Sequence, residues 1–288
     1  MAIIYLLLSI VFSTFINLVF KWFSVFKVNK IQAILVNYLV CFSIGFVLSG
    51  DFNLLKIIGS DWFKYCIILG SLFVAIFLSM AMTTEKYGVS VNAVSAKMSV
   101  IIPVLFAYVY NSERLTIQFV VGILLSLLSI YLITKKKQII IPKKYIYLPI
   151  IVFLGSGTID TSLKLLELNY SNDISINTIS YSIFLGAFLV GTTFYAIKNQ
   201  FNFSNWSSRN IISGIILGIP NYFSIYFLLT AIKSFSLKSA FVFGINNIGI
   251  VLLSTLLSVI IFKEKLTLIN KFGVLISVLS IILIAYAS

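Results

Sequence analysis

Residues 111–116 read NSERLT, and residues 262–267, 151 positions later, read FKEKLT. Three more identities at the same separation pair Gly122 with Gly273, Ser126 with Ser277 and Ser129 with Ser280. Serine matches alone can arise by chance in a biased composition. A turn of acid, base, Leu and Thr with a glycine at a fixed distance after it arises by chance far less readily. The match predicts an internal repeat in which each copy ends with the apolar segment that follows this turn.

Apolar segments long enough to cross a bilayer make up most of the chain. Of the 288 residues, 60% are hydrophobic and 10% are charged, whereas soluble domains contain about 25% charged residues. A spanning helix needs about 20 mostly apolar residues, and ten segments meet this criterion: 3–23, 31–49, 62–83, 90–110, 116–134, 145–166, 174–197, 211–232, 237–262 and 268–287. Their continuous apolar character excludes a β-barrel. The sequence therefore predicts an all-α integral membrane protein with ten transmembrane helices.

The repeat assigns five of these helices to each half of the protein. We expect a first repeat over residues 1–136, a basic connecting loop over 137–144 and a second repeat over 145–288. A second match, shifted by 143, aligns Ser13, Asn17 and Lys21 with Ser156, Asp160 and Lys164, and residues 68–70 loosely match residues 216–218. Because five is odd, the second copy enters the membrane from the opposite side. Inverted repeats of this kind are typical of secondary transporters, whose substrate sites lie near the midplane between the halves.

The repeated turn also resembles a known family signature. Glu113-Arg114-Leu115-Thr116 and Glu264-Lys265-Leu266-Thr267 are similar to the turn that closes each EamA domain, and residues 88–91, Gly122 and Lys21 fit the same pattern. Ahead of the acid, residues 111–112 and 262–263 differ from the family's usual hydrophobic-Gly pair. The resemblance covers nearly the whole chain and implies the drug/metabolite transporter superfamily. Its members are ten-helix carriers, often of metabolites or amino acids.

Ionisable side chains within the predicted spans are candidate functional residues, because each costs about 2.5–3.5 kcal/mol to insert. Lys97 lies seven residues into the fourth segment, and Asp160 is the one acid in a span interior. Lys97 could bind a substrate carboxylate or phosphate or act as a gating cation. Alternatively, it could stay paired with Asp160 or with backbone carbonyls. Asp160 could carry a coupling proton, or form a static pair together with Lys164 on the same helix face. Lys21 occupies the position equivalent to Lys164.

Uncharged polar residues and prolines complete the candidate site. Asn246 and Asn247 lie midway along the ninth segment, near the position equivalent to Lys97, and Asn92 lies close to Lys97 itself. The amides could line a substrate cavity or join neighbouring helices by hydrogen bonds. Weaker candidates for the cavity wall are Asn17 and Asn37. Asn221 and Tyr222 directly follow Pro220 and could line the substrate path or belong to a hinge. Pro220 and Pro103 are predicted hinges, because proline removes a backbone hydrogen bond and kinks a helix.

These features favour a secondary transporter of a small polar metabolite, an amino acid or a related anionic or zwitterionic compound. The alternatives are a lipid or polyprenyl-phosphate flippase and, less favoured, an integral membrane enzyme. The sequence has no histidine and no Walker A pattern, so we expect no catalytic activity, no metal and no cofactor. The expected partners are the substrate, the bilayer and a coupling proton, in a monomer or homodimer, and we expect no nucleic acid.

The charges and composition also bear on membrane location. Heavy use of Ile, Lys and Asn favours a multi-pass protein of a bacterial cytoplasmic membrane. Most of the 21 Lys and Arg residues fall in the odd-numbered connections, which the positive-inside rule assigns to the cytoplasm, with both termini outside. The family resemblance implies the opposite orientation.

Overall fold

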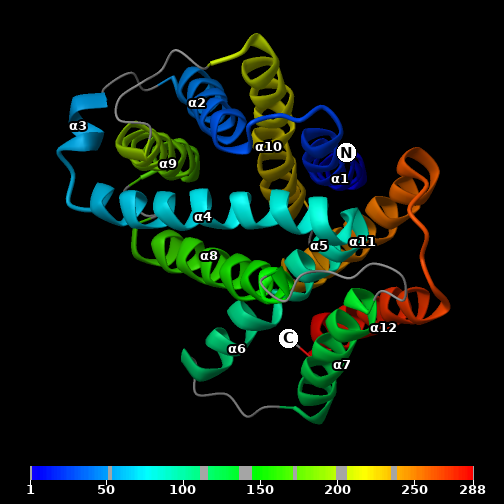
Figure 1. Ribbon diagram of the computed structural model, residues 1–288. Helices are drawn as coiled ribbons and strands as arrows, with labels where there is room; N and C mark the ends of the chain where they lie inside the picture. The colour runs from blue at the N-terminus through cyan, green and yellow to red at the C-terminus, as the bar shows by residue number, and fades with distance from the viewer. Residues whose placement is uncertain are drawn as a thin grey trace. The chain divides into compact units, whose positions relative to one another are not determined.

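The computed structural model describes residues 2–50, 54–110, 116–135, 145–170, 174–198, 206–234 and 239–287, and within these ranges the regular secondary structure is helical, without strands (Figure 1). The helices are α1 (Ala2–Val25), α2 (Lys30–Ser49), α3 (Leu54–Ile58), α4 (Phe63–Tyr87), α5 (Val89–Met98), α6 (Ile101–Tyr110), α7 (Ile117–Thr134), α8 (Leu148–Tyr170), α9 (Ile176–Lys198), α10 (Ser208–Ser234), α11 (Ser239–Phe262) and α12 (Leu268–Ala287).

The all-helical prediction is confirmed. In the described ranges, seven helical stretches are long and apolar enough to cross a membrane, and shorter apolar stretches lie in α7, α8 and α12. Short α3, in the connection after α2, was not predicted. The first copy of the repeated turn, through residue 115, and the predicted connecting loop over 137–144 lie outside the described residues.

The helix predicted over 90–110 is interrupted. α5 ends at Met98, Ser99 and Val100 form a turn, and α6 begins at Ile101. Pro103 explains the position of the break, because a proline has no N–H for the carbonyl four residues earlier, and its ring clashes with that carbonyl. The carbonyl belongs to Ser99, which accepts instead from the amide of Ile102 at 2.9 Å.

Pro220, unlike Pro103, does not lie at a break between helices. α10 continues through it from Ser208 to Ser234 as one helix. Membrane helices tolerate an internal proline because neighbouring groups and local adjustments satisfy the freed carbonyl. The residue therefore lies buried within a helix.

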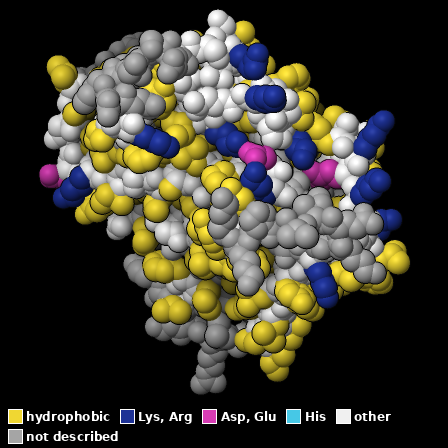
Figure 2. All heavy atoms as spheres, in the orientation of Figure 1, with side chains coloured by type: hydrophobic (Ala, Val, Ile, Leu, Met, Phe, Trp, Pro, Cys, Tyr) yellow, Lys and Arg dark blue, Asp and Glu magenta, His cyan; other side chains and the backbone are white. Residues whose placement is uncertain are grey.

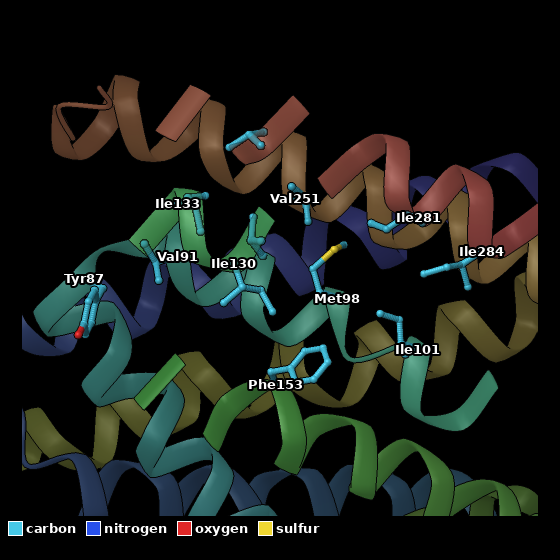
Figure 3. Packing of buried hydrophobic residues seen from close by; sticks show 12 residues of the cluster. Tyr87, Val91, Met98, Ile101, Ile130, Ile133, Phe153, Val251, Ile281 and Ile284 are labelled. Carbon is cyan, nitrogen blue, oxygen red and sulfur yellow. The ribbon is translucent and has the colours of Figure 1, made fainter. Parts of the chain in front are cut away.

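The chain divides into two compact units. Unit 1 comprises Met1–Lys21, Ser79–Thr158 and Phe223–Ser288, and unit 2 comprises Trp22–Leu78 and Ile159–Tyr222. Each unit contains helices from both predicted repeats. Within unit 1, α5, α7, α11 and α12 pack against one another. Figure 3 shows their shared core, in which Val91 and Met98 of α5 lie among Ile130, Val251 and Ile281.

Helices α7 and α12 of unit 1 pack in a reciprocal, antiparallel manner. A Cβ built on Gly122 would lie 2.8 Å from Ile284 Cγ1 and 3.5 Å from the Ser280 carbonyl oxygen. A Cβ on Gly273 would lie 2.9 Å from the Ile133 nitrogen and 3.2 Å from the Ser129 carbonyl oxygen. Gly122, Ser129 and Ile133 of α7 correspond in the repeat to Gly273, Ser280 and Ile284 of α12, each 151 residues later. The contact around Gly122 is therefore repeated around Gly273 with the roles of the two helices exchanged, as in an interface with two-fold symmetry.

We expect Gly273→Ala to destabilise the protein more than Gly122→Ala. The atom nearest to a Cβ at position 273 is backbone, whereas the atom nearest to position 122 is a side-chain carbon that can rotate away. Overpacking costs about 1–3 kcal/mol, and we expect Gly122→Ala near the low end and Gly273→Ala near the high end. Melting temperatures in detergent measure both. Adding Ile284→Ala should relieve Gly122→Ala and leave Gly273→Ala unrelieved; equal relief of both would contradict the packing.

Unit 2 is built on α2 and α9, which also run antiparallel. Gln32 Nε2 donates to the Tyr195 hydroxyl at 2.6 Å near one end, and Tyr38 stacks on Phe184 further along. Asn210 of α10 donates to Gln32 Oε1, which ties a third helix to the pair. Two glycines from the loosely matched residues 68–70 and 216–218 make close contacts. Gly70 of α4 abuts the α9 backbone, and Gly218 of α10 abuts α2.

Large apolar side chains remain exposed on many helices. Examples are Ile3 and Leu7 on α1, Leu124 on α7, and Leu268 and Phe272 on α12. Figure 2 shows hydrophobic side chains over much of one face. Exposed apolar surface of this extent is costly in water and suits contact with lipid.

Candidate functional site

Three buried polar residues of unit 1 form a hydrogen-bonded chain across α1, α5 and α11. Asn92 Nδ2 donates to Asn17 Oδ1 at 2.8 Å, and Asn17 Nδ2 donates to Ser254 Oγ at 3.2 Å. All three side chains are at most 3% exposed. Hydrogen bonding compensates for burying amides among apolar helices. The structure therefore brings together two residues that the sequence singled out separately, Asn17 and Asn92.

Glu264 connects the same three helices at a second point. Its Oε1 accepts from the Val89 amide at 2.9 Å, and its Oε2 accepts from the Ser90 hydroxyl at 3.4 Å. Lys21 Nζ lies 4.0 Å from Oε1, and the Ser90 and Ser258 hydroxyls are 3.0 Å apart. A carboxylate at the first turn of α5 satisfies an orphan N–H and suits the positive end of the helix dipole. Glu264 thus caps α5 and pairs with a lysine of α1.

Gly88 makes this cap possible. Its φ is +102°, a conformation that side-chain-bearing residues rarely adopt. A Cβ there would lie 2.6 Å from Glu264 Oε1. The glycine therefore allows both the turn between α4 and α5 and the approach of the carboxylate.

The other candidates of unit 1 lie further along α5 and α11. Lys97 is half-buried in the last turn of α5. Asn246 and Asn247 are buried in α11, at 2% and 7% exposure. The hydrophobic cluster brings together Met98 and Ile248, the chain neighbours of Lys97 and Asn247. Within the described part of the chain, buried Asn246 Oδ1 has no hydrogen-bond partner.

The other charged candidates are Asp160, Lys164 and Lys21, which lie elsewhere in the chain than Lys97, Asn246 and Asn247. Asp160 belongs to unit 2, in α8, and its side chain is exposed. Lys164 follows one turn later in α8, and its side chain is outside the described residues. Lys21 is 23% exposed and lies beside Glu264, as described above.

The polar candidates of unit 2 form a second group. Asn221 Nδ2 donates to Asn37 Oδ1 at 3.0 Å, joining α10 to α2. The Cys41 thiol donates to the Gly218 carbonyl at 3.3 Å. The Tyr222 hydroxyl donates to Asn177 Oδ1 of α9 at 3.1 Å. Asn221 and Tyr222 therefore connect α10 to both helices of the α2–α9 pair.

Comparisons with known proteins find similar chains, but the descriptions of these chains name no activity. A Haemophilus influenzae protein described as uncharacterized is 28% identical over 263 residues, which cover 88% of this chain and 88% of that protein. A solved chain, described only as the crystal structure of a protein, shares 14% identity with a TM-score of 0.64 over 98% of this chain and 95% of that chain. At this identity the likeness concerns the fold alone. No protein-family model matches the chain.

Several residues of the polar groups were absent from the sequence-based candidates, among them Glu264 and Ser254. Glu264 was noted only as part of the repeated turn, and Ser254 is one of several serines in an apolar helix. The signal for Glu264 was its place in the repeated turn, whereas its contacts with α5 depend on tertiary packing. For a metal site, the described residues contain no group of three or more His, Cys, Asp or Glu side chains that could hold an ion.

Proposed function

We propose that this protein is a secondary transporter that carries a small polar metabolite across the bacterial cytoplasmic membrane by alternating access. The observation that carries this proposal is the pairing of equivalent helices. The fifth and tenth predicted segments pair as α7 and α12, the second and seventh as α2 and α9, and the fourth and ninth as α5 with α11. Two copies of a five-helix unit inserted in opposite directions would run antiparallel at every such pair.

The direction of each pair agrees with this expectation. In α7 and α12 the contacts of Gly122 with Ile284 and of Gly273 with Ile133 run in opposite chain directions. In α2 and α9 the contacts of Gln32 with Tyr195 and of Tyr38 with Phe184 do the same. In unit 1, Ser90 of α5 meets Ser258 of α11, whereas Met98, further along α5, packs with Val251, which comes earlier in α11. These contacts support two inverted repeats of the EamA type in the drug/metabolite transporter superfamily.

Buried hydrogen-bonding groups supply the chemistry for a polar substrate. Asn17 and Asn92 in unit 1, and Asn221 and Tyr222 in unit 2, present amides and a hydroxyl within apolar helices. Lys97 favours a substrate with a carboxylate or phosphate, hence an amino acid or a related anion. Asp160 is the carboxylate through which we propose proton coupling. Pro103, beside the break between α5 and α6, and Pro220 are the proposed hinges.

A lipid or polyprenyl-phosphate flippase is the second candidate. The extensive exposed apolar surface suits an amphiphilic substrate equally well. An assay of fluorescent-lipid translocation in vesicles separates the two functions. Translocation of the lipid without metabolite flux would replace the carrier proposal.

We expect Lys97→Ala to lower transport about tenfold or more, because a desolvated cation contacting a substrate anion contributes at least about 1.4 kcal/mol. Comparing metabolites inside and outside deletion and overexpression strains first identifies the substrate, and uptake into proteoliposomes then gives rates. Asp160→Asn should abolish the dependence on a proton gradient while leaving exchange between unlabelled and labelled substrate. Lys271→Ala, at an exposed lysine of α12, is the matched control. Wild-type rates in both Lys97→Ala and Asp160→Asn would refute the role of these charges.

The lysine distribution gives the orientation that we propose, with both termini outside. A tag at the C-terminus, tested for accessibility in intact cells, measures it directly. A tag reached only after permeabilisation would favour the orientation that the family resemblance implies.

A further inference from the structure

Three buried oxygen atoms on α1 and α5 have no hydrogen-bond partner among the residues that the structure describes. They are Thr14 Oγ1, Asn92 Oδ1 and Ser95 Oγ. The three residues are 1%, 0% and 0% exposed, so bulk water does not reach them. Each unsatisfied buried polar group costs about 1–3 kcal/mol. Several together in one helix interface indicate a bound ion or water.

The register of the two helices places the three residues in adjacent layers of one interface. Lys21 lies beside Glu264, which also binds the Val89 amide, and four residues earlier in α1 Asn17 meets Asn92. Lower numbers in α1 therefore lie opposite higher numbers in α5. Thr14 comes one turn before Asn17, and Ser95 comes one turn after Asn92. Both belong to the next layer of the interface, about 4.5 Å along the helices.

The hydrogen bonds of the two asparagines determine which atom Asn92 presents. Asn17 Nδ2 lies 3.4 Å from the Ser13 carbonyl oxygen, which can only accept a hydrogen bond. This assigns the nitrogen of the Asn17 amide to that side, so that its oxygen faces Asn92. Asn92 must then donate through its nitrogen, which leaves its oxygen without a donor. An amide oxygen and two hydroxyls form a neutral set of acceptors, and hard cations prefer oxygen ligands of this kind.

The break after α5 places the negative end of a helix dipole near this set. α5 ends at Met98, so Ser95 lies in its last turn. Cations are favoured at a helix C-terminus, and discontinuous transmembrane helices surround sodium sites in other transporters. Lys97 is in the same turn, but at 100° per residue it points about 200° away from Ser95. Its charge therefore faces another side of α5.

We propose that Thr14, Asn92 and Ser95 form a binding site for a sodium ion. Complete burial suits an ion the size of a water molecule. Sodium binding itself does not depend on the transporter assignment. The use of sodium as a coupling ion does depend on that assignment. Sodium would then act at unit 1, either together with the proton at Asp160 or in its place.

The test is the melting temperature of the purified full-length protein in chloride salts of sodium, potassium, ammonium or choline at equal ionic strength. A ligand that binds only the folded state stabilises it in proportion to RT ln(1 + [L]/Kd), so sodium at about 100 times its Kd should raise the melting temperature by about 5 °C over choline. No rise with sodium, or an equal rise with ammonium, overturns the site, because the oxygens would then hold water or a protonated amine.

Two variants locate the effect. Ser95→Ala and Thr14→Val each remove one oxygen and nearly preserve side-chain volume. We expect both to lose most of the sodium-dependent rise while melting in choline at or above the wild-type temperature. Thr14→Ser keeps the oxygen and should keep the rise. The matched control is Ser126→Ala on α7, because Ser126 is also fully buried and its hydroxyl has no partner in the described ranges. A sodium effect that survives in both Ser95→Ala and Thr14→Val, or disappears in Ser126→Ala, refutes the assignment.

Transport measurements separate this proposal from the proposed function. Metabolite flux without a sodium-dependent melting shift retains the carrier and removes the sodium site. A sodium-dependent shift that the two variants abolish, in a protein for which no flux is found, retains the site and removes the carrier.

Discussion

Glu264→Ala is expected to lower the free energy of unfolding by about 2–3 kcal/mol, because it removes a helix cap and a charge-assisted hydrogen bond together. The carboxylate accepts from the Val89 amide and the Ser90 hydroxyl and lies 4.0 Å from Lys21. With alanine at this position, the first turn of α5 loses its acceptor. Because α5 carries Asn92 and Lys97, we also expect transport to fall at least tenfold.

The control for this change is Glu85→Ala. Glu85 also pairs with a lysine, Lys86, at 2.5 Å, but on the same helix and at higher exposure, 28% against 13% for Glu264. Exposed pairs contribute about 0–1 kcal/mol. Glu264→Gln, which keeps one acceptor oxygen, should fall between the two. Chemical unfolding in mixed micelles measures all three variants; a loss no larger in Glu264→Ala than in Glu85→Ala would show that the cap contributes little.

Gly70→Ala is expected to have the largest effect on stability. A Cβ at Gly70 would collide with the backbone of Gly186 and Ala187 of α9, and a Cβ at Gly186 would lie 2.5 Å from the Cys66 carbonyl oxygen. Small residues at such crossings let two membrane helices approach closely. Since no side chain can rotate away, we expect a loss of at least about 3 kcal/mol, the upper end for overpacking, and poor recovery of monodisperse protein in detergent.

Gly50→Ala separates this steric effect from the general cost of replacing a glycine. Gly50 has φ of +68°, but no atom of the described residues lies within 4 Å of a Cβ built there. Its replacement should cost about 1–2 kcal/mol, the price of a left-handed conformation for an alanine. Size-exclusion profiles and melting temperatures compare the two variants. A Gly70→Ala protein as stable as Gly50→Ala would mean that α4 and α9 can separate without loss.

The helices could be predicted because their causes are local. Runs of Ile, Leu, Val and Phe of about 20 residues form helices wherever the backbone must satisfy its own hydrogen bonds in lipid. Pro103 was recognised from sequence, but its effect was underestimated, since it separates α5 from α6. Pro220, by contrast, lies within α10, which continues through it as one helix. Proline thus lies beside a break between two helices at one position and within a continuous helix at the other.

By itself, the sequence determined that this protein is a set of apolar helices and that Glu264 belongs to a repeated turn. It also determined that Gly122 and Gly273 occupy equivalent positions. Only the tertiary structure decided that these two glycines contact each other's neighbours reciprocally and that Glu264 caps α5. It also decided that Asn17 and Asn92 bond to each other. Hydropathy and spacing act along the chain, whereas the partner of a buried polar group depends on which helix faces it, and many helix arrangements satisfy the same apolar pattern.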